Sequence, residues 1–210
     1  MARPRAARYD GQRDQILARA AELFARQGYT ATTMNQVAAA CGVTKPTLYH
    51  YVADKQSLLL HIAAGHVERL ERLAHDVQEQ VLEQTLTPAA RLRLLIERFM
   101  QAYAHAQNEH RVLTEDVRFL PDAQRLQVLA GQRRVVAGFA DAVAALRPEL
   151  RAARLHQPLT MLLFGMMNWT FTWLRRDGAL SYEALGDVVA DLFCGGVFAV
   201  ATGETRQPGA

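Results

Sequence analysis

Residues that can donate hydrogen bonds to phosphates and to base edges are concentrated between Thr33 and Lys55. Lysine, hydroxyl and imidazole groups make most contacts to a nucleic-acid backbone, and lysine and threonine also reach base edges. Both lysines of the chain fall within this stretch. The pattern predicts a nucleic-acid contact surface. Its expected members are Thr33, Thr44, Lys45, Pro46, Thr47, Leu48, Tyr49, His50, Tyr51 and Lys55.

Two short helices are expected to carry these residues. Thr33 followed by Gln36 is a reciprocal capping pattern, so a helix should begin at Met34. Gly42 suits the left-handed backbone of the turn that ends this helix. Thr44 can cap a second helix, which would present its polar side chains outward. This order is typical of a helix-turn-helix, in which the second helix lies in the major groove.

A third helix should follow directly. Asp54 can cap it, which places Lys55 in the first turn, where free backbone amides attract an anion. An apolar stripe from Leu59 to Val81 predicts that the helix continues to about Gln84. It would connect the helix-turn-helix to the rest of the chain. An ordinary helical hairpin with a polar face is the alternative interpretation.

Residues 12–60 resemble the DNA-binding domain of TetR-type repressors. The resemblance rests on QILARAAELFARQGYTATTM and on VAAACGVTKPTLYHYVADKQSLL. Two positions depart from the family pattern, because Val52 stands where Phe is usual and Gln56 where Glu is frequent. The resemblance implies a transcription regulator that binds operator DNA.

The remainder of the sequence predicts helices and almost no strand. One helix is expected to end near Leu174, and Ser181 is expected to cap a last helix that ends at Ala201. We therefore expect an all-α protein of about nine helices, with an N-terminal three-helix helix-turn-helix DNA-binding domain and a C-terminal helical ligand-binding and dimerisation domain. The expected segments are a basic flexible arm (1–10), the DNA-binding domain (11–55), the C-terminal domain (56–203) and a frayed tail (204–210).

Charge is unevenly distributed along the chain. Residues 1–60 contain eight basic and four acidic side chains, whereas residues 61–210 contain sixteen and seventeen. The positive excess therefore coincides with the expected DNA contacts. Cys41 and Cys194 lie far apart, and no secretory signal or long apolar span is present, which predicts a reduced, cytoplasmic protein that does not enter a membrane.

No catalytic constellation is expected. His61/His66 and His105/His110 are each five residues apart, which on a helix turns the second ring about 140° away from the first. Neither pair therefore predicts a metal site. A glycine-rich phosphate loop and a cysteine cluster are both absent from the sequence, so we expect no enzyme and no cofactor. A helical adaptor that does not bind DNA is the alternative from another class.

A homodimer through the last two helices is expected. The segment PLTMLLFGMMNWTFTWL is apolar nearly all round, and Gly195-Gly196 would let another helix come close. Two such pairs would form a four-helix bundle, and a twofold protein matches a palindromic operator. The TetR resemblance implies the same arrangement.

A small-molecule effector is expected in the C-terminal domain. The runs GMMNWTFTWLRRDGALSYE and HRVLTEDVRFLPDA resemble the TetR branch that responds to acyl-coenzyme A thioesters, which implies a repressor released from DNA by such a ligand. Indoles and an amide beside an apolar wall, with an arginine for phosphates, suit this chemistry. Core or dimer packing of the same side chains, and a sensor of cationic drugs, are the alternatives. The expected lining residues are Arg118, Phe119, Phe164, Met166, Asn168, Trp169 and Trp173.

Overall fold

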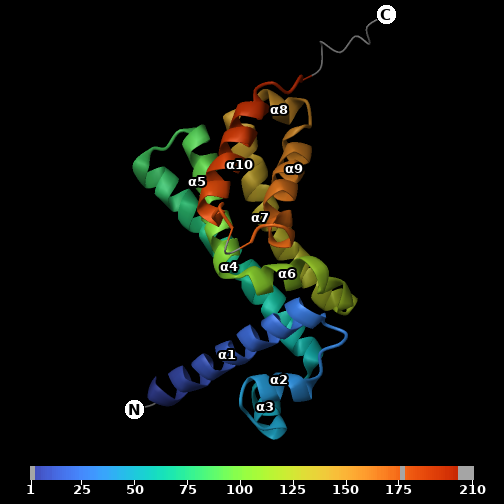
Figure 1. The fold of residues 1–210 in the computed structure, drawn as a ribbon. Helices are drawn as coiled ribbons and strands as arrows, with labels where there is room; N and C mark the ends of the chain where they lie inside the picture. Colours follow the sequence, from blue (N-terminus) through green and yellow to red (C-terminus); the bar gives the residue numbers. More distant parts are fainter. Residues whose placement is uncertain (1–2, 176–177, 203–210) are drawn as a thin grey trace, which may run out of the picture. The chain divides into compact units, whose positions relative to one another are not determined.

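The computed structural model describes residues 3–175 and 178–202, with side chains from residue 9 onward. Within these ranges the chain is all-helical and contains no β-strand, as predicted (Figure 1). The elements in chain order are α1 (Arg3–Gln27), α2 (Met34–Ala40), α3 (Lys45–Tyr51), α4 (Lys55–Gln84), α5 (Pro88–His105), α6 (Gln107–Glu115), the 3-10 helix η1 (Val117–Phe119), α7 (Asp122–Leu146), α8 (Glu149–Ala152), α9 (His156–Asn168), the 3-10 helix η2 (Trp169–Thr172) and α10 (Tyr182–Val197).

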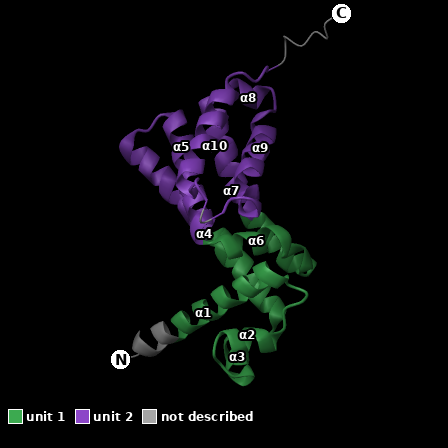
Figure 2. Cartoon of the chain, viewed as in Figure 1, with its two compact units in different colours: residues 1–68, 106–131 green, residues 69–105, 132–210 purple. Residues whose placement is uncertain are grey.

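The chain forms two compact units, each built from two separate stretches of sequence (Figure 2). The first unit comprises residues 1–68 and 106–131, and the second comprises residues 69–105 and 132–210. The division therefore falls within α4 and α7, and differs from the boundary expected after residue 55. The reason is that the first half of α4 and helix α6 share one apolar core with α1, α2 and α3.

The chain start also differs from the expected flexible arm. Helix α1 begins at Arg3, so the backbone from there to residue 10 is helical. Alanine and arginine favour a helix, and a proline in the first turn is tolerated because its missing amide has no partner there. The arm's arginine side chains and the tail at 204–210 lie outside the described residues.

The core of the first unit fixes the two short helices. Ile16 and Phe24 of α1, Leu48 of α3 and Leu58 of α4 are all fully or almost fully buried. Leu48 is the side chain of α3 that enters this core. Apart from Leu48 and the half-buried Tyr51, which packs against the same core, α3 faces outward.

The second unit is organised around α10, which packs against α5 on one side and α9 on the other (Figure 1). A Cβ added at Gly186 would lie 3.4 Å from Cβ of Met100, so glycine permits the close approach of α10 to α5. Phe139 of α7 contacts both Phe99 and Phe164, with ring centroids 4.8 and 4.9 Å apart. Aromatic rings therefore join three helices of this core.

Helix α9 ends earlier than expected. The α-helical hydrogen bonding stops at Asn168, and residues 169–172 form a tighter 3-10 turn instead of continuing towards Leu174. The hydroxyls of Thr170 and Thr172 donate to the carbonyl oxygens of Met167 and Trp169, each at 2.7 Å. Such side-chain bonds to the preceding turn compete with regular helix geometry, which accounts for the difference.

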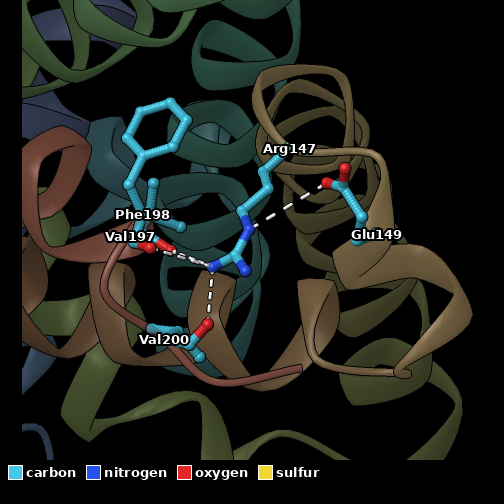
Figure 3. Close-up of polar contacts among 5 residues, drawn as sticks. All are labelled: Arg147, Glu149, Val197, Phe198 and Val200. Carbon is cyan, nitrogen blue, oxygen red and sulfur yellow. Dashed lines mark hydrogen bonds and ion pairs between the residues drawn. The ribbon is translucent and has the colours of Figure 1, made fainter. Parts of the chain in front are cut away.

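The end of α10 is held by an arginine from another part of the fold. Ser181 caps the start of α10 as predicted, but the helix ends at Val197 and not at Ala201. Figure 3 shows the Arg147 guanidinium donating to the carbonyl oxygens of Val197 (2.9 Å), Phe198 (3.3 Å) and Val200 (2.6 Å). A cation bonded to the last carbonyls of a helix satisfies their free acceptors and suits the helix dipole.

Candidate nucleic-acid interface and effector site

Helix α2 and the turn after it have the predicted geometry. The backbone amide of Gln36 donates to the Thr33 hydroxyl at 3.2 Å, and the backbone amide of Thr33 donates to Oε1 of Gln36 at 2.8 Å, so the capping box is complete. Gly42 has a φ of +65°, which is the left-handed conformation expected there. These contacts set the direction in which α3 leaves the turn.

Helix α3 is capped by Thr44 and presents most of its side chains to solvent. The Thr44 hydroxyl accepts from the Thr47 amide at 3.3 Å and lies 2.8 Å from the Thr47 hydroxyl. The residues of α3 expected to contact DNA are exposed at 45, 46, 47, 49 and 50, and Tyr51 is half-buried. Leu48 is fully buried, so its inclusion among the contacts was wrong.

Lys55 has a structural role that the sequence analysis did not predict. Its ammonium donates to the carbonyl oxygens of Tyr29 (3.0 Å), Thr30 (3.3 Å) and Thr32 (2.9 Å). It also lies 4.5 Å from the centre of the Tyr29 ring. An ammonium has three N–H groups, so these carbonyls occupy its donors and the expected phosphate contact is corrected to a structural one.

Tyr9 of α1 packs against α3, a contact that was not predicted from the sequence. Its ring stacks on Tyr51 with centroids 4.7 Å apart and meets His50 edge-on at 5.9 Å. Assignment of residues 1–10 to a flexible arm concealed this contact. An aromatic residue within a run of helix-forming residues was the available signal.

The seven expected effector residues are divided between the two units. Arg118 and Phe119 belong to the first unit, where Phe119 stacks on Tyr29 at 5.4 Å and the Arg118 guanidinium lies 4.9 Å from the Phe119 ring. The other five belong to the second unit. Neither unit therefore brings all seven together.

Within the second unit, the expected effector residues have different environments. Phe164 is buried in the core, and Met166 packs against the same core. The Tyr103 hydroxyl donates to Oδ1 of Asn168 at 3.0 Å, and burial raises the pKa of Tyr103, which keeps it a neutral donor. Trp169 and Trp173 are more than half exposed. Asn168 is thus oriented by a buried tyrosine, while both indoles face outward.

Two buried histidines form a pair across helices. Nε2 of His66 in α4 lies 3.3 Å from Nδ1 of His110 in α6, and both side chains are almost completely buried. The spacing of histidines within one helix could not predict this contact between α4 and α6. Within the described residues, the possible metal-ligand group is His75, Asp76 and Glu79, all exposed on α4.

The comparisons with known proteins agree with this geometry. A family model described as "Bacterial regulatory proteins, tetR family" matches residues 16–62, and one described as "Tetracyclin repressor-like, C-terminal domain" matches residues 85–197. The second match spans more than half of the chain. The chain belongs to the TetR family.

Individual TetR-family relatives cover different shares of the chain. A solved TetR-family regulator from Bordetella parapertussis is 38% identical with a TM-score of 0.80, and the alignment covers 90% of this chain and 97% of that one. The transcriptional activator FasR of Mycolicibacterium smegmatis is 33% identical over 51% of this chain and 47% of its own length. The chain thus spans about half of that curated relative. AibR, solved with isovaleryl coenzyme A and operator DNA, is 26% identical with a TM-score of 0.71, over 86% of this chain and 97% of that one.

The described part of this TetR-family chain contains no helix long and apolar enough to cross a membrane.

Lys55→Gln should lower the stability of this TetR-family protein. The three carbonyl groups lose a charged donor, and hydrogen bonds to charged groups contribute about 1.5–3 kcal/mol each when both partners are buried, so we expect a loss of about 1–3 kcal/mol at this partly exposed site. Urea unfolding measures it. Lys45→Gln is the matched control and should change the free energy of unfolding by less than about 0.5 kcal/mol. Equal effects of the two substitutions would contradict the role given to Lys55.

Asp116 should make the stability depend on pH. Burial and the neighbouring Glu115 raise the pKa of Asp116 to about 6, and its position at the end of α6 also disfavours a negative charge. The folded pKa exceeds the unfolded one, so ionisation costs stability above pH ~6, and the cost vanishes below pH ~4. Asp116→Asn should therefore raise the free energy of unfolding by up to about 3 kcal/mol at pH ~8 and leave it unchanged at pH ~4.

Chemical unfolding at the two pH values tests this expectation for Asp116. Asp14→Asn changes an exposed carboxylate of the same unit and is the control. A gain that is the same at both pH values would show that ionisation of Asp116 is not its cause.

Proposed function

We propose that this TetR-family protein is a transcriptional repressor that binds palindromic operator DNA as a homodimer and is released by an acyl-coenzyme A thioester. The observation that carries the DNA-binding part is the exposed face of α3. Its lysine, threonine, tyrosine and histidine donors stand on a helix whose start is capped and whose single buried residue is Leu48. Such a helix can enter a major groove while Leu48 stays in the core.

Lys45 and Tyr49 are the central residues of this proposal. They lie one helical turn apart, and the Lys45 ammonium is 6.0 Å from the centre of the Tyr49 ring. Both side chains are exposed. An ammonium at the start of the helix can donate to guanine or to a phosphate, and the phenol can donate to a phosphate.

The dimer is supported by apolar side chains that α9 and α10 leave uncovered. Large residues that are mostly solvent-exposed include Met161, Leu162, Leu192 and Phe198, which follows α10 directly. Apart from neighbouring residues of its own helix, a Cβ added at Gly195 or Gly196 would meet no described atom within 4 Å. A second copy that packs its own α9 and α10 here would cover the apolar side chains, and the glycines would let the backbones approach.

An acyl thioester fits the second unit better than a cation does. Among the described residues of this unit no Asp or Glu is buried, whereas a buried carboxylate is the usual partner of a cationic drug. Asn168 presents an amide that is held by Tyr103 next to an apolar core. AibR, in its complex with isovaleryl coenzyme A and operator DNA, is a related protein with this type of effector.

The proposed switch is an equilibrium between a DNA-binding and a released arrangement of the dimer. An effector shifts this equilibrium only if it binds the released arrangement more tightly. A shift from almost complete binding to almost complete release needs about 10⁴-fold preference, or about 5.5 kcal/mol, which two sites in a dimer would share.

Lys45→Ala and Tyr49→Ala should each weaken operator binding about tenfold or more, because a contact to a base or phosphate contributes about 1–3 kcal/mol. Fluorescence anisotropy with labelled DNA from upstream of the gene measures the affinity. The melting temperature should stay unchanged, since both side chains are exposed. Arg151→Gln removes a positive charge from the second unit and should bind DNA like the unaltered protein. Unchanged affinity in both α3 variants would contradict the assignment of α3.

The effector class can be tested on the same DNA complex. Acyl-coenzyme A thioesters of increasing chain length are added, with the corresponding free acids and unacylated coenzyme A as controls. Release by a thioester at concentrations where its free acid has no effect is expected. DNA binding without release by any thioester would refute the effector class alone, while no binding to DNA at low salt would refute the regulator.

A further inference from the structure

A pocket of about 430 Å³ lies in the second unit between α4 and α5. Helix α4 contributes most of its wall and α5 contributes one arginine. The pocket combines three guanidinium groups with an apolar floor. Its lining residues are Arg69, Arg72, Leu73, Asp76, Val77, Gln80 and Arg98.

The pocket carries excess positive charge. Within the described residues, Arg72 and Arg98 form no ion pair, and Asp76 is the single acidic residue of the lining. Two neighbouring carboxylates pair with other arginines, since Glu71 lies 2.7 Å from Arg134 and Glu97 lies 3.9 Å from Arg93. An anion that enters would therefore meet the guanidinium groups of Arg72 and Arg98, which form no ion pair with a carboxylate of the described residues.

The kind of anion follows from the donor set and the floor. A guanidinium presents a planar fork of N–H groups that matches phosphate oxygens, and several such forks on one pocket favour an anion with more than one phosphate. Val77 is buried in the core of the second unit, and Leu73 packs against that core. The floor thus suits an organic molecule whose uncharged part can lie against apolar side chains.

We propose that the pocket formed by Arg69, Arg72 and Arg98 binds the phosphate groups of the effector's coenzyme A. The assignment rests on the proposed function in one respect, namely that the phosphates belong to an acyl-coenzyme A effector. Under this assignment, α4 carries residues of the phosphate pocket and also follows the helix-turn-helix directly, since it is one continuous helix from Lys55 to Gln84. Two arginines of the pocket, Arg69 and Arg72, are therefore on the same helix as Lys55, its first residue.

The test measures binding of two probes by isothermal titration calorimetry. Unacylated coenzyme A and sodium pyrophosphate are titrated into the full chain at constant ionic strength. Arg72→Gln/Arg98→Gln should weaken binding of coenzyme A at least tenfold. The matched control is Arg151→Gln/Arg154→Gln, which removes the same charge from α8 and the turn after it in the same unit, and should bind as the unaltered protein does.

A second variant guards against a loss caused by unfolding. Arg72→Lys/Arg98→Lys keeps both charges but removes the guanidinium forks, so it should bind coenzyme A more weakly than the unaltered protein and more tightly than the glutamine variant. Equal binding of coenzyme A by the pocket and control variants would overturn the proposal.

The outcomes separate this proposal from the proposed function. If the pocket variants keep full affinity while an acyl thioester still releases DNA, the pocket is not the phosphate site but the effector class stands. If pyrophosphate binding depends on Arg72 and Arg98 while no thioester releases DNA, the pocket stands as a phosphate site and the effector class falls.

Discussion

The surface proposed to contact DNA depends on helices that are too short to be stable alone. Helices α2 and α3 have seven residues each, well below the length at which an isolated helix persists in water. The Thr33 and Thr44 hydroxyls each accept from one free backbone amide at the start of these helices, and the buried side chain of Leu48 ties α3 to a core built by α1 and α4. Because Leu48, the half-buried Tyr51 and two caps provide this support, the exposed side chains of α3 can serve a partner.

The turn after α1 is held by a lysine ammonium, because its backbone carbonyl groups need hydrogen-bond donors. The carbonyl groups of residues 29–32 follow a helix end, where acceptors lack partners within the helix. Lys55, in the first turn of α4, donates to the carbonyl oxygens of three of these residues. It thereby joins the turn after α1 to the start of the long helix. A phosphate contact by Lys55 would require those bonds to break, which is why charge and position in the sequence were misleading at this residue.

Local features of the fold could be predicted from the sequence, and contacts between distant residues could not. The caps at Thr33, Thr44 and Ser181 and the turn at Gly42 depend on residues within four positions, so their patterns are visible in the chain itself. The pairing of His66 with His110 joins residues 44 positions apart, and spacing along a single helix carries no information about such a contact. The expected effector residues stay a prediction for a related reason, since an aromatic stripe has the same spacing whether it enters a core, as Phe164 does, or faces outward, as Trp169 does.

Helix α4 is where the two proposed binding events can influence each other. Its first half shares the core of the helix-turn-helix, and its second half shares the core of the second unit. A continuous α-helix bends sharply only where its hydrogen bonding is interrupted. The His66 to His110 bond and the packing of α1 on α6 connect the first half of α4 to the rest of its unit. An effector that moves α4 must therefore act on this packed group as a whole, because close-packed cores rearrange between discrete states and do not deform continuously.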